Sequence, residues 1–171
     1  MAETLALIRE FSDPLFTRAL GHHGELLFES ALASTEFRVE QRKVRKVDGR
    51  EWNETEHDMD FLISNQGVRY GVEIKNQLSY IDQTEFQIKL KMCKFLGVRP
   101  FFCVRMMPSN YFSEIIEGGG FCLVTENQNY PVLAAALAKR VRDQLGLPVA
   151  VIERMPDSAM RRFEKWHART V

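Results

Sequence analysis

The sequence predicts an α/β domain built on a mixed β-sheet, and two observations carry that prediction. Along the 171 residues, strand-like runs and amphipathic helical segments follow in the order helix, three strands, helix, two strands, helix, strand, helix. The three early strands are joined by short turns, which is typical of antiparallel pairing, whereas helices separate most of the later strands and predict crossovers. Because no internal repeat or linker interrupts the chain, residues 1–171 are expected to form a single domain.

The predicted elements begin and end at recognisable signals. Asp13 and Pro14 provide an N-cap and a first-turn proline for a helix that ends near Ser34. Asp82 starts a second helix in a capping-box-like pattern, and Gly97 stops it. The remaining expectations are strands over 36–47, 59–63, 68–74, 100–104, 121–124 and 148–152, a hairpin turn at 64–67, and helices over 133–145 and 158–167.

The net charge is zero, with 23 Lys and Arg against 23 Asp and Glu, so a strongly basic pI does not argue for nucleic-acid binding. The charge is nevertheless unevenly distributed, because residues 36–50 carry six basic side chains against three acidic ones, and residues 51–60 carry five acidic side chains and no Lys or Arg. A basic strand beside a carboxylate cluster suits phosphate contacts, and a solvated face of mixed charge is the alternative. The candidate nucleic-acid-binding residues are Arg38, Arg42, Lys43, Arg45 and Lys46.

The three cysteines, Cys93, Cys103 and Cys122, lack CxxC spacing. They indicate neither a disulfide framework nor a zinc knuckle, and are typical of small buried side chains in a reducing compartment. The sequence shows neither a signal peptide nor an apolar run long enough to cross a membrane. A cytoplasmic location without membrane association is therefore expected.

Four charged residues on two neighbouring strands form the most informative constellation. Alternate residues of a strand share a face, so Asp58 and Asp60 lie on one face of their strand, as do Glu73 and Lys75 on the next. A hairpin turn at 66–67 sets Asp60 opposite Glu73 and Asp58 opposite Lys75. Two carboxylates so close repel each other, and a divalent cation such as Mg²⁺ is the simplest compensation.

A third carboxylate comes from the first helix. At 100° per residue, Glu25 lies at the edge of the apolar stripe that includes Phe28 and Leu32. A carboxylate at that border is costly unless it is paired or bound to a metal. Taken alone, Glu25 is more typical of a surface glutamate.

Asp60 and the sequence Glu73-Ile74-Lys75 resemble the signature of the PD-(D/E)XK, or restriction-endonuclease-like, nuclease superfamily. Residues 21–25, Gly-His-His-Gly-Glu, are similar to the first-helix motif of archaeal Holliday junction resolvases. The resemblance covers residues 15–104. Asp60 follows Met59 rather than proline, and the chain is longer and less basic than a typical archaeal resolvase.

The resemblance implies a three-layer restriction-endonuclease-like fold with a catalytic core at about 15–105 and a C-terminal α/β extension at about 106–171. It implies hydrolysis of phosphodiester bonds, with Asp60, Glu73, the carbonyl of Ile74 and Glu25 holding Mg²⁺, for which Mn²⁺ substitutes. Lys75 would orient the attacking water and stabilise developing negative charge. Asp58, Gln87 and His22 are auxiliary candidates.

The expected function is a metal-dependent endonuclease acting on duplex or branched DNA, with the exact substrate and biological role left open. A zinc hydrolase using His22, His23 or His57 is less favoured, because adjacent helical histidines point about 100° apart. A non-catalytic nucleic-acid-binding or scaffold protein on the same fold is the main alternative. A homodimer also stays open, since the apolar segment 132–145 suits either an interface or the core.

Overall fold

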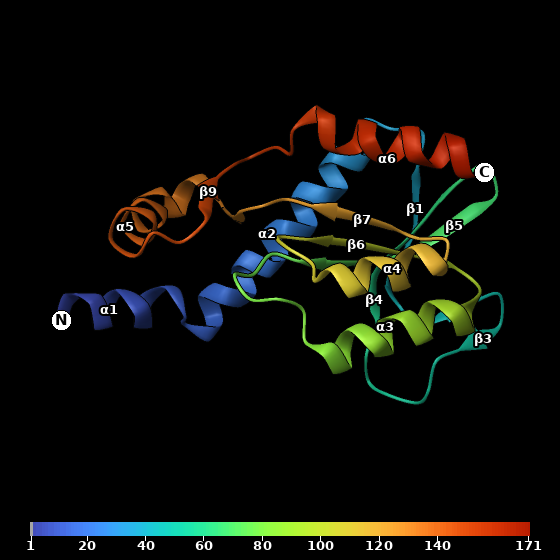
Figure 1. Ribbon diagram of the computed structural model, residues 1–171, viewed down its shortest axis with the longest axis horizontal. Coiled ribbons are helices and arrows are strands. Elements are labelled where there is room, and N and C mark those ends of the chain that lie inside the picture. Colours follow the sequence, from blue (N-terminus) through green and yellow to red (C-terminus); the bar gives the residue numbers. More distant parts are fainter. Residues whose placement is uncertain (1) are drawn as a thin grey trace.

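A computed structural model describes residues 2–171, and its centre is a mixed five-stranded sheet in the order β1-β4-β5-β6-β7 (Figure 1). The strands β1 (Arg38–Val44), β4 (Met59–Asn65) and β5 (Val68–Lys75) are antiparallel neighbours. The strands β6 (Arg99–Val104) and β7 (Phe121–Val124) continue the sheet in parallel from β5. The predicted α/β class, with an antiparallel meander first and crossovers later, is confirmed.

Two helices cover one face of the sheet and enclose the largest aromatic core. They are α2 (Pro14–Leu32) and α6 (Asp157–Thr170), which lie over the sheet in Figure 1. Phe28 of α2 and Phe163 of α6 are both fully buried against Phe101 of β6, with ring centroids 5.4 and 4.5 Å from that ring. Apolar burial on this scale is the main stabilising contribution to the layer.

The opposite face is covered by α3 (Gln83–Leu96) and α4 (Ser109–Glu117), which lie together below the sheet in Figure 1. Phe86 of α3 stacks on Tyr111 of α4, with ring centroids 4.1 Å apart, and both rings pack on Phe102 or its neighbours in the sheet. Asp82 caps α3 by accepting the backbone N–H of Glu85, as its capping sequence predicts.

A smaller group of elements extends from one end of the sheet. It comprises α1 (Ala2–Phe11), the 3₁₀ helix η1 (Val132–Ala134), α5 (Ala135–Leu145), and the parallel pair β8 (Gln128–Tyr130) and β9 (Val149–Val151). We call this group the lobe. Its core, which includes Leu7, Tyr130 and Val141, also takes in Leu20 from the first half of α2.

Every predicted helix and strand is present, and the differences are additional elements. The predicted strand over 36–47 ends as β1 at Val44, and the chain continues into a small hairpin of β2 (Lys46–Val47) and β3 (Arg50–Glu51). Asp48 and Gly49 turn this hairpin with φ values of 48° and 82°. The helices α1 and α4 and the strand β8 were not predicted, and the predicted strand over 148–152 pairs with β8 rather than with the main sheet.

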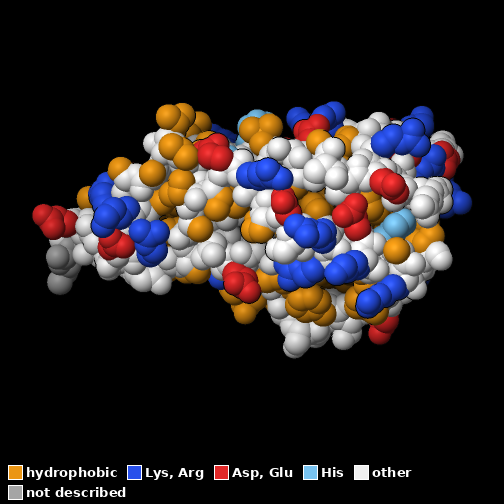
Figure 2. All heavy atoms as spheres, turned by 90° about the horizontal axis from the view of Figure 1, so that it is seen from above, with side chains coloured by type: hydrophobic (Ala, Val, Ile, Leu, Met, Phe, Trp, Pro, Cys, Tyr) orange, Lys and Arg blue, Asp and Glu red, His pale blue; other side chains and the backbone are white. Residues whose placement is uncertain are grey.

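The face that carries α6 has mixed charge. Viewed from that side, Lys and Arg side chains alternate with Asp and Glu (Figure 2). Arg154 and Arg161 both pair with Asp157. Within residues 2–171, no helix is both long enough and apolar enough to cross a membrane.

Candidate active site

The hairpin of β4 and β5 sets the register of the central carboxylates. Gln66 and Gly67 form the turn with φ values of 49° and 80°, and Phe61 pairs with Val72 across the ladder. Continuing that register by one residue places Asp60 opposite Glu73, as the sequence predicts. Asp58 precedes the first residue of β4, so the predicted pairing of Asp58 with Lys75 is not part of this ladder.

Asp60 is the electrostatic centre of the site. One oxygen of its carboxyl group, Oδ2, accepts the backbone N–H of Ile74 at 2.7 Å. Burial raises the pKa of Asp60 to about 7, with further increases from the charges of Glu73 and Glu25, while the Ile74 N–H and Lys89 lower it. The ionised form of Asp60 is therefore disfavoured first by burial and then by the neighbouring carboxylates, and a bound cation would stabilise it.

Glu73 lies beneath the site and is held by two ammonium groups. It is 1% exposed, with the Nζ atom of Lys89 2.5 Å from one oxygen and that of Lys75 2.9 Å from the other. Lys75 also reaches Glu85 at 2.7 Å. Although burial lowers the pKa of Lys75, the two carboxylates raise it above its ordinary value, so this side chain is firmly cationic.

Lys89 and Glu85 are the site residues that sequence reasoning missed. Lys89 is 4% exposed, and it donates both to Glu73 and to the carbonyl of Asp58. A signal was present, because Lys89 lies three residues after Phe86 and four before Cys93, on the buried stripe of α3. A lysine in that stripe needs a buried acceptor, and Glu73 supplies it.

A cleft of about 770 Å³ brings the predicted residues of three elements together. Asp60, Ile74 and Lys75 line it from the sheet, and His22 and Glu25 line it from α2. Glu25 has a side chain 41% exposed, and the Nδ1 atom of His22 lies 3.9 Å from its carboxylate. Glu73 is not among the cleft-lining residues, so it acts on the cleft through Asp60 and Lys75.

The cleft offers hard oxygen donors for a cation. Among the residues the structure describes, no group of three or more His, Cys, Asp or Glu side chains is arranged to hold a metal ion. Asp60, Glu25 and Ile74 nevertheless line the same cleft, and Mg²⁺ typically takes one or two carboxylates with water completing its shell. These donors fit a cation, because burial and the neighbouring charges of Glu73 and Glu25 raise the pKa of Asp60, and a cation beside its carboxylate would favour the ionised form.

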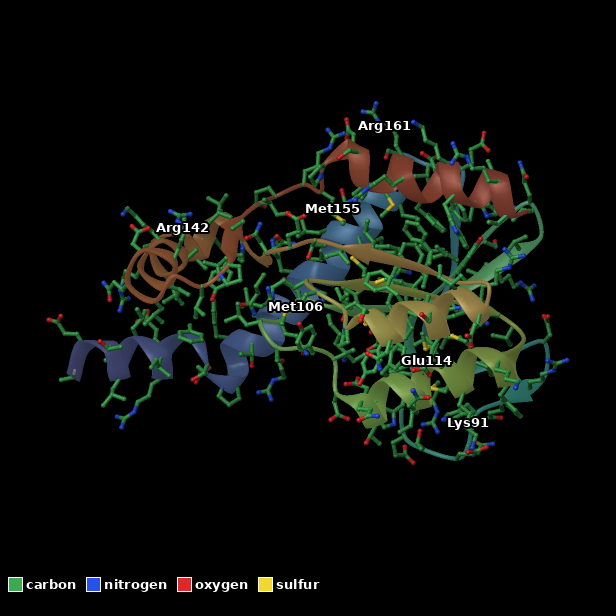
Figure 3. All side chains as sticks on the ribbon, viewed as in Figure 1. Lys91, Met106, Glu114, Arg142, Met155 and Arg161 are labelled. Atoms are coloured by element: carbon green, nitrogen blue, oxygen red, sulfur yellow. The ribbon has the colours of Figure 1, made fainter. Side chains whose placement is uncertain are left out.

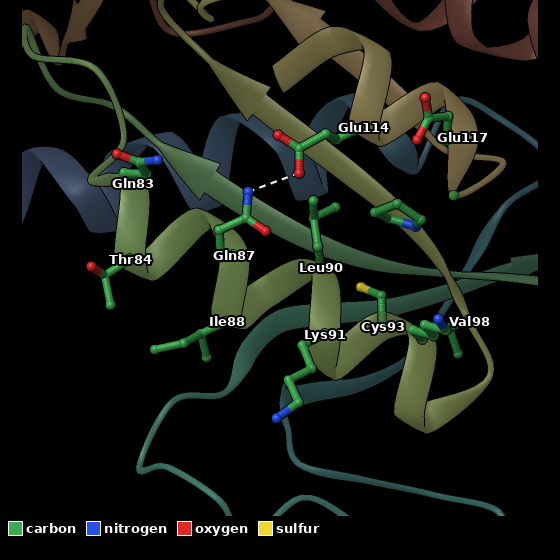
Figure 4. Close-up of a pocket in the computed structure, with 13 residues that line it drawn as sticks. Gln83, Thr84, Gln87, Ile88, Leu90, Lys91, Cys93, Val98, Glu114 and Glu117 are labelled. Atoms are coloured by element: carbon green, nitrogen blue, oxygen red, sulfur yellow. Dashed lines mark hydrogen bonds between the residues drawn. The ribbon is translucent and has the colours of Figure 1, made fainter. Parts of the chain in front are cut away.

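Gln87 lies away from this cleft. Its Nε2 donates to Glu114 at 2.8 Å across a second groove, of about 990 Å³, between α3 and α4 (Figure 4). Asp58 contributes its backbone carbonyl to Lys89, and its side chain does not line the cleft. Of the three auxiliary candidates, the structure therefore brings His22 alone to the cleft.

The five basic residues of 38–46 have different surroundings. Arg45 is held within its own loop, donating to the carbonyls of Trp52 and Thr55 at 3.2 and 2.9 Å and pairing with Glu56. Arg42 pairs with Glu29, and Lys46 lies 3.8 Å from Glu51. Arg38 lines a separate polar cavity. Lys43 is exposed and lies in register with Asp60, between the pairs Arg42–Phe61 and Val44–Met59.

The histidines weighed as zinc ligands have separate partners. His23 contacts the carbonyl of Ile152 through Nε2 at 3.0 Å, whereas His57 contacts the hydroxyl of Thr55 through Nδ1 at 3.0 Å. His22 faces Glu25. Each ring is thus oriented by its own neighbour.

Comparisons with known proteins give a limited result. No protein-family model matches the chain, and no curated protein matches it significantly. A structure of EndoMS in complex with double-stranded DNA is 14% identical over 57% of this chain and 40% of its own, with a TM-score of 0.42. Pyrococcus furiosus SfsA in complex with Ca²⁺ is 18% identical over 62% of this chain and 55% of its own, with a TM-score of 0.41. The chain thus spans about half the length of each, and at these TM-scores neither likeness assigns a function.

Proposed function

We propose that this protein is a metal-dependent nuclease that hydrolyses phosphodiester bonds of DNA, cutting within the strand. The observation that carries the proposal is the cleft lined by Asp60, Ile74 and Lys75 of adjoining strands and by Glu25 of α2. The carboxylate of Asp60, with its raised pKa, beside the fixed ammonium group of Lys75 forms a site for a cation and a phosphate together.

Asp60, Glu25 and the Ile74 carbonyl are the groups proposed to hold Mg²⁺, or Mn²⁺ in its place. When bound, such an ion supplies Lewis acidity to the phosphoryl group and lowers the pKa of the attacking water. The Ile74 N–H holds Oδ2 of Asp60 in place, so the carboxylate is oriented before substrate arrives.

Lys75 is proposed to stabilise the negative charge that develops on the phosphoryl oxygens. Its ammonium group is fixed between Glu73 and Glu85, and the two carboxylates keep it protonated. Glu73 therefore acts through Lys75 and Asp60, and Lys89 balances the charge of Glu73 from below.

The test is cleavage of plasmid, linear, branched and single-stranded DNA, and of RNA, in Mg²⁺, Mn²⁺ or EDTA. We expect DNA cleavage that EDTA abolishes, and a loss of about 10²-fold or more in Asp60→Asn and Lys75→Ala. Lys91→Ala, a change of an exposed lysine on α3, is the matched control. Failure to cut any substrate in Mn²⁺, or wild-type cleavage by Lys75→Ala with its circular dichroism unchanged, would reject the mechanism.

A second measurement separates metal binding from catalysis. Calorimetric titration with Mg²⁺ is expected to show binding to the wild-type protein that Asp60→Asn loses and Lys91→Ala keeps. Light scattering on the same samples tests whether the protein is a homodimer.

A non-catalytic nucleic-acid-binding protein is the second candidate. The observation in its favour is that Lys75 and Lys89 already neutralise Glu73 from both sides, so part of the acidic site is balanced without a metal. Under this candidate, DNA binds equally well in Mg²⁺ and in EDTA, and Asp60→Asn leaves the affinity unchanged.

A further inference from the structure

The cleft continues along α2, away from the carboxylates and towards the corner between α1 and α2. Its lining residues there include Ser12, Thr17 and Arg18. Arg18, His22 and Glu25 follow at intervals of four and three residues, so they share one face of the helix. The helix thus presents to the cleft a guanidinium, an imidazole and a carboxylate in a row.

Arg18 is the cation in this cleft that is free to meet an external anion. Its side chain is exposed, and none of the ion pairs formed among residues 2–171 involves it. Lys75, the other Lys or Arg that lines the cleft, is already held by Glu73 and Glu85. A guanidinium is also the side chain best shaped for bidentate contact with a phosphate.

The floor between Arg18 and Glu25 is open. Gly21 lies between them on α2, and a Cβ atom added there would meet no described atom within 4 Å. An extended chain can therefore pass directly over the backbone of the helix at this position.

The opposite wall, segment 76–79, is fixed rather than loose. The Nδ2 atom of Asn76 donates to the carbonyls of Leu20 and Asn129 at 2.8 and 2.7 Å, and its Oδ1 accepts the Asn129 N–H at 2.7 Å. Two nitrogens of Arg105 donate to the carbonyl of Leu78 at 3.0 and 2.6 Å. Both walls are thus held before any ligand binds, which lowers the cost of binding an extended ligand.

From these observations we infer that Arg18 is a phosphate-binding residue for a nucleic-acid strand that runs along α2, away from the bond to be cut. Glu25 lies seven positions after Arg18 on the helix, which is about 10 Å at 1.5 Å per residue. At about 3.4 Å per nucleotide, Arg18 meets a phosphate roughly three nucleotides from the reacting bond. This inference rests on the proposed function for the position of the reacting bond.

The test measures binding of a labelled single-stranded oligonucleotide and of its duplex by fluorescence anisotropy, in Ca²⁺ and across a range of salt concentrations. Arg18→Ala is expected to weaken binding about tenfold and to reduce the slope of log Kd against log salt by about 0.7–0.9, the contribution of one phosphate contact. Arg18→Lys is expected to restore the salt slope. Arg161→Ala, which removes an exposed arginine on α6 (Figure 3) that does not line the cleft, is the control and is expected to bind as wild type.

A substrate with a single phosphodiester, bis(p-nitrophenyl) phosphate, separates this inference from the proposed function. It reaches the carboxylates but not Arg18, so Arg18→Ala should hydrolyse it as wild type does while losing activity on long DNA. If DNA binding depends on Arg18 but nothing is hydrolysed, the nuclease proposal fails and Arg18 keeps its role. If wild type cuts DNA and Arg18→Ala matches it in affinity and salt slope, or wild type binds no nucleic acid, the role of Arg18 is wrong.

Discussion

Replacing Lys89 by methionine removes one ammonium group from a buried ion pair while keeping most of the volume of the side chain. Glu73 and Lys89 are 1% and 4% exposed, with the charged atoms 2.5 Å apart. In the Lys89→Met variant, Glu73 keeps Lys75 as a partner at 2.9 Å, but the carbonyl of Asp58 loses its lysine donor. The variant thus leaves a buried carboxylate half compensated.

Lys89→Met is expected to lower the free energy of unfolding by about 3 kcal/mol. This is the lower end of the range of about 3–5 kcal/mol for removing one partner of a buried ion pair, because Lys75 remains as the second partner of Glu73. With a urea m-value of about 2 kcal/mol/M, the midpoint of unfolding falls by about 1.5 M. Combining Lys89→Met with Glu73→Gln removes the stranded charge, so the double variant should recover at least half of the loss.

The assay is urea unfolding followed by circular dichroism in EDTA, which keeps metal binding out of the comparison. Lys91→Met is the matched control on the same helix, because Lys91 pairs with Glu54 at the surface and such pairs contribute about 0.2–1 kcal/mol. The reasoning is refuted if Lys89→Met costs no more than Lys91→Met, or if the double variant is as unstable as the sum of its single changes.

Three further outcomes follow from the same structure. Because the pKa of Asp60 is raised to about 7, the folded protein holds this proton more tightly than the unfolded chain does. The contribution of Asp60 to the free energy of unfolding in EDTA therefore declines from about pH 4 to pH 7, and Asp60→Asn should raise the Tm more at pH 8 than at pH 4. Gly24→Ala should lower the free energy of unfolding by about 1–3 kcal/mol, because the added Cβ would lie 2.7 Å from Cβ of Asn76. Gly21→Ala has open space around it and should raise the free energy of unfolding by about 0.5–1 kcal/mol, so equal urea midpoints for the two variants would contradict this. Burial raises the pKa of the Cys93 and Cys103 thiols to about 12, so a thiol reagent at pH 8 should label these two buried cysteines only after unfolding, and their rapid labelling in the native protein would count against the packing.

The local chemistry of the chain was sufficient to predict the main sheet and the hairpin of β4 and β5. The turn at Gln66 and Gly67 fixes the register, and the register places Asp60 opposite Glu73, so this part of the site follows from turn residues and two-residue periodicity. Glu25 was found from helical periodicity, which also explains why it lines the cleft beside His22.

Tertiary contacts decided what the sequence did not predict. The short strand β8 exists because β9 pairs with it from 21 residues further on, as in the pair Gln128–Val149. Arg45 was grouped with the phosphate-binding candidates, but the carbonyls of Trp52 and Thr55 surround its guanidinium. For Lys89 the helical pattern was sufficient to predict burial, because the residue lies on the buried stripe of α3. Its partner Glu73 on β5 could not be predicted, because that contact depends on how α3 crosses the sheet.

The helix α2 has a mechanical consequence, because one continuous element is shared by two hydrophobic cores. Leu20 packs in the core of the lobe, while Leu27 and Phe28 pack against the main sheet. At 19 residues the helix is about 28 Å long, and Glu25 lies between the two ends. One rigid element therefore fixes the position of the lobe relative to the sheet, so His22 and Glu25, which lie between the two cores on α2, keep a set distance from both.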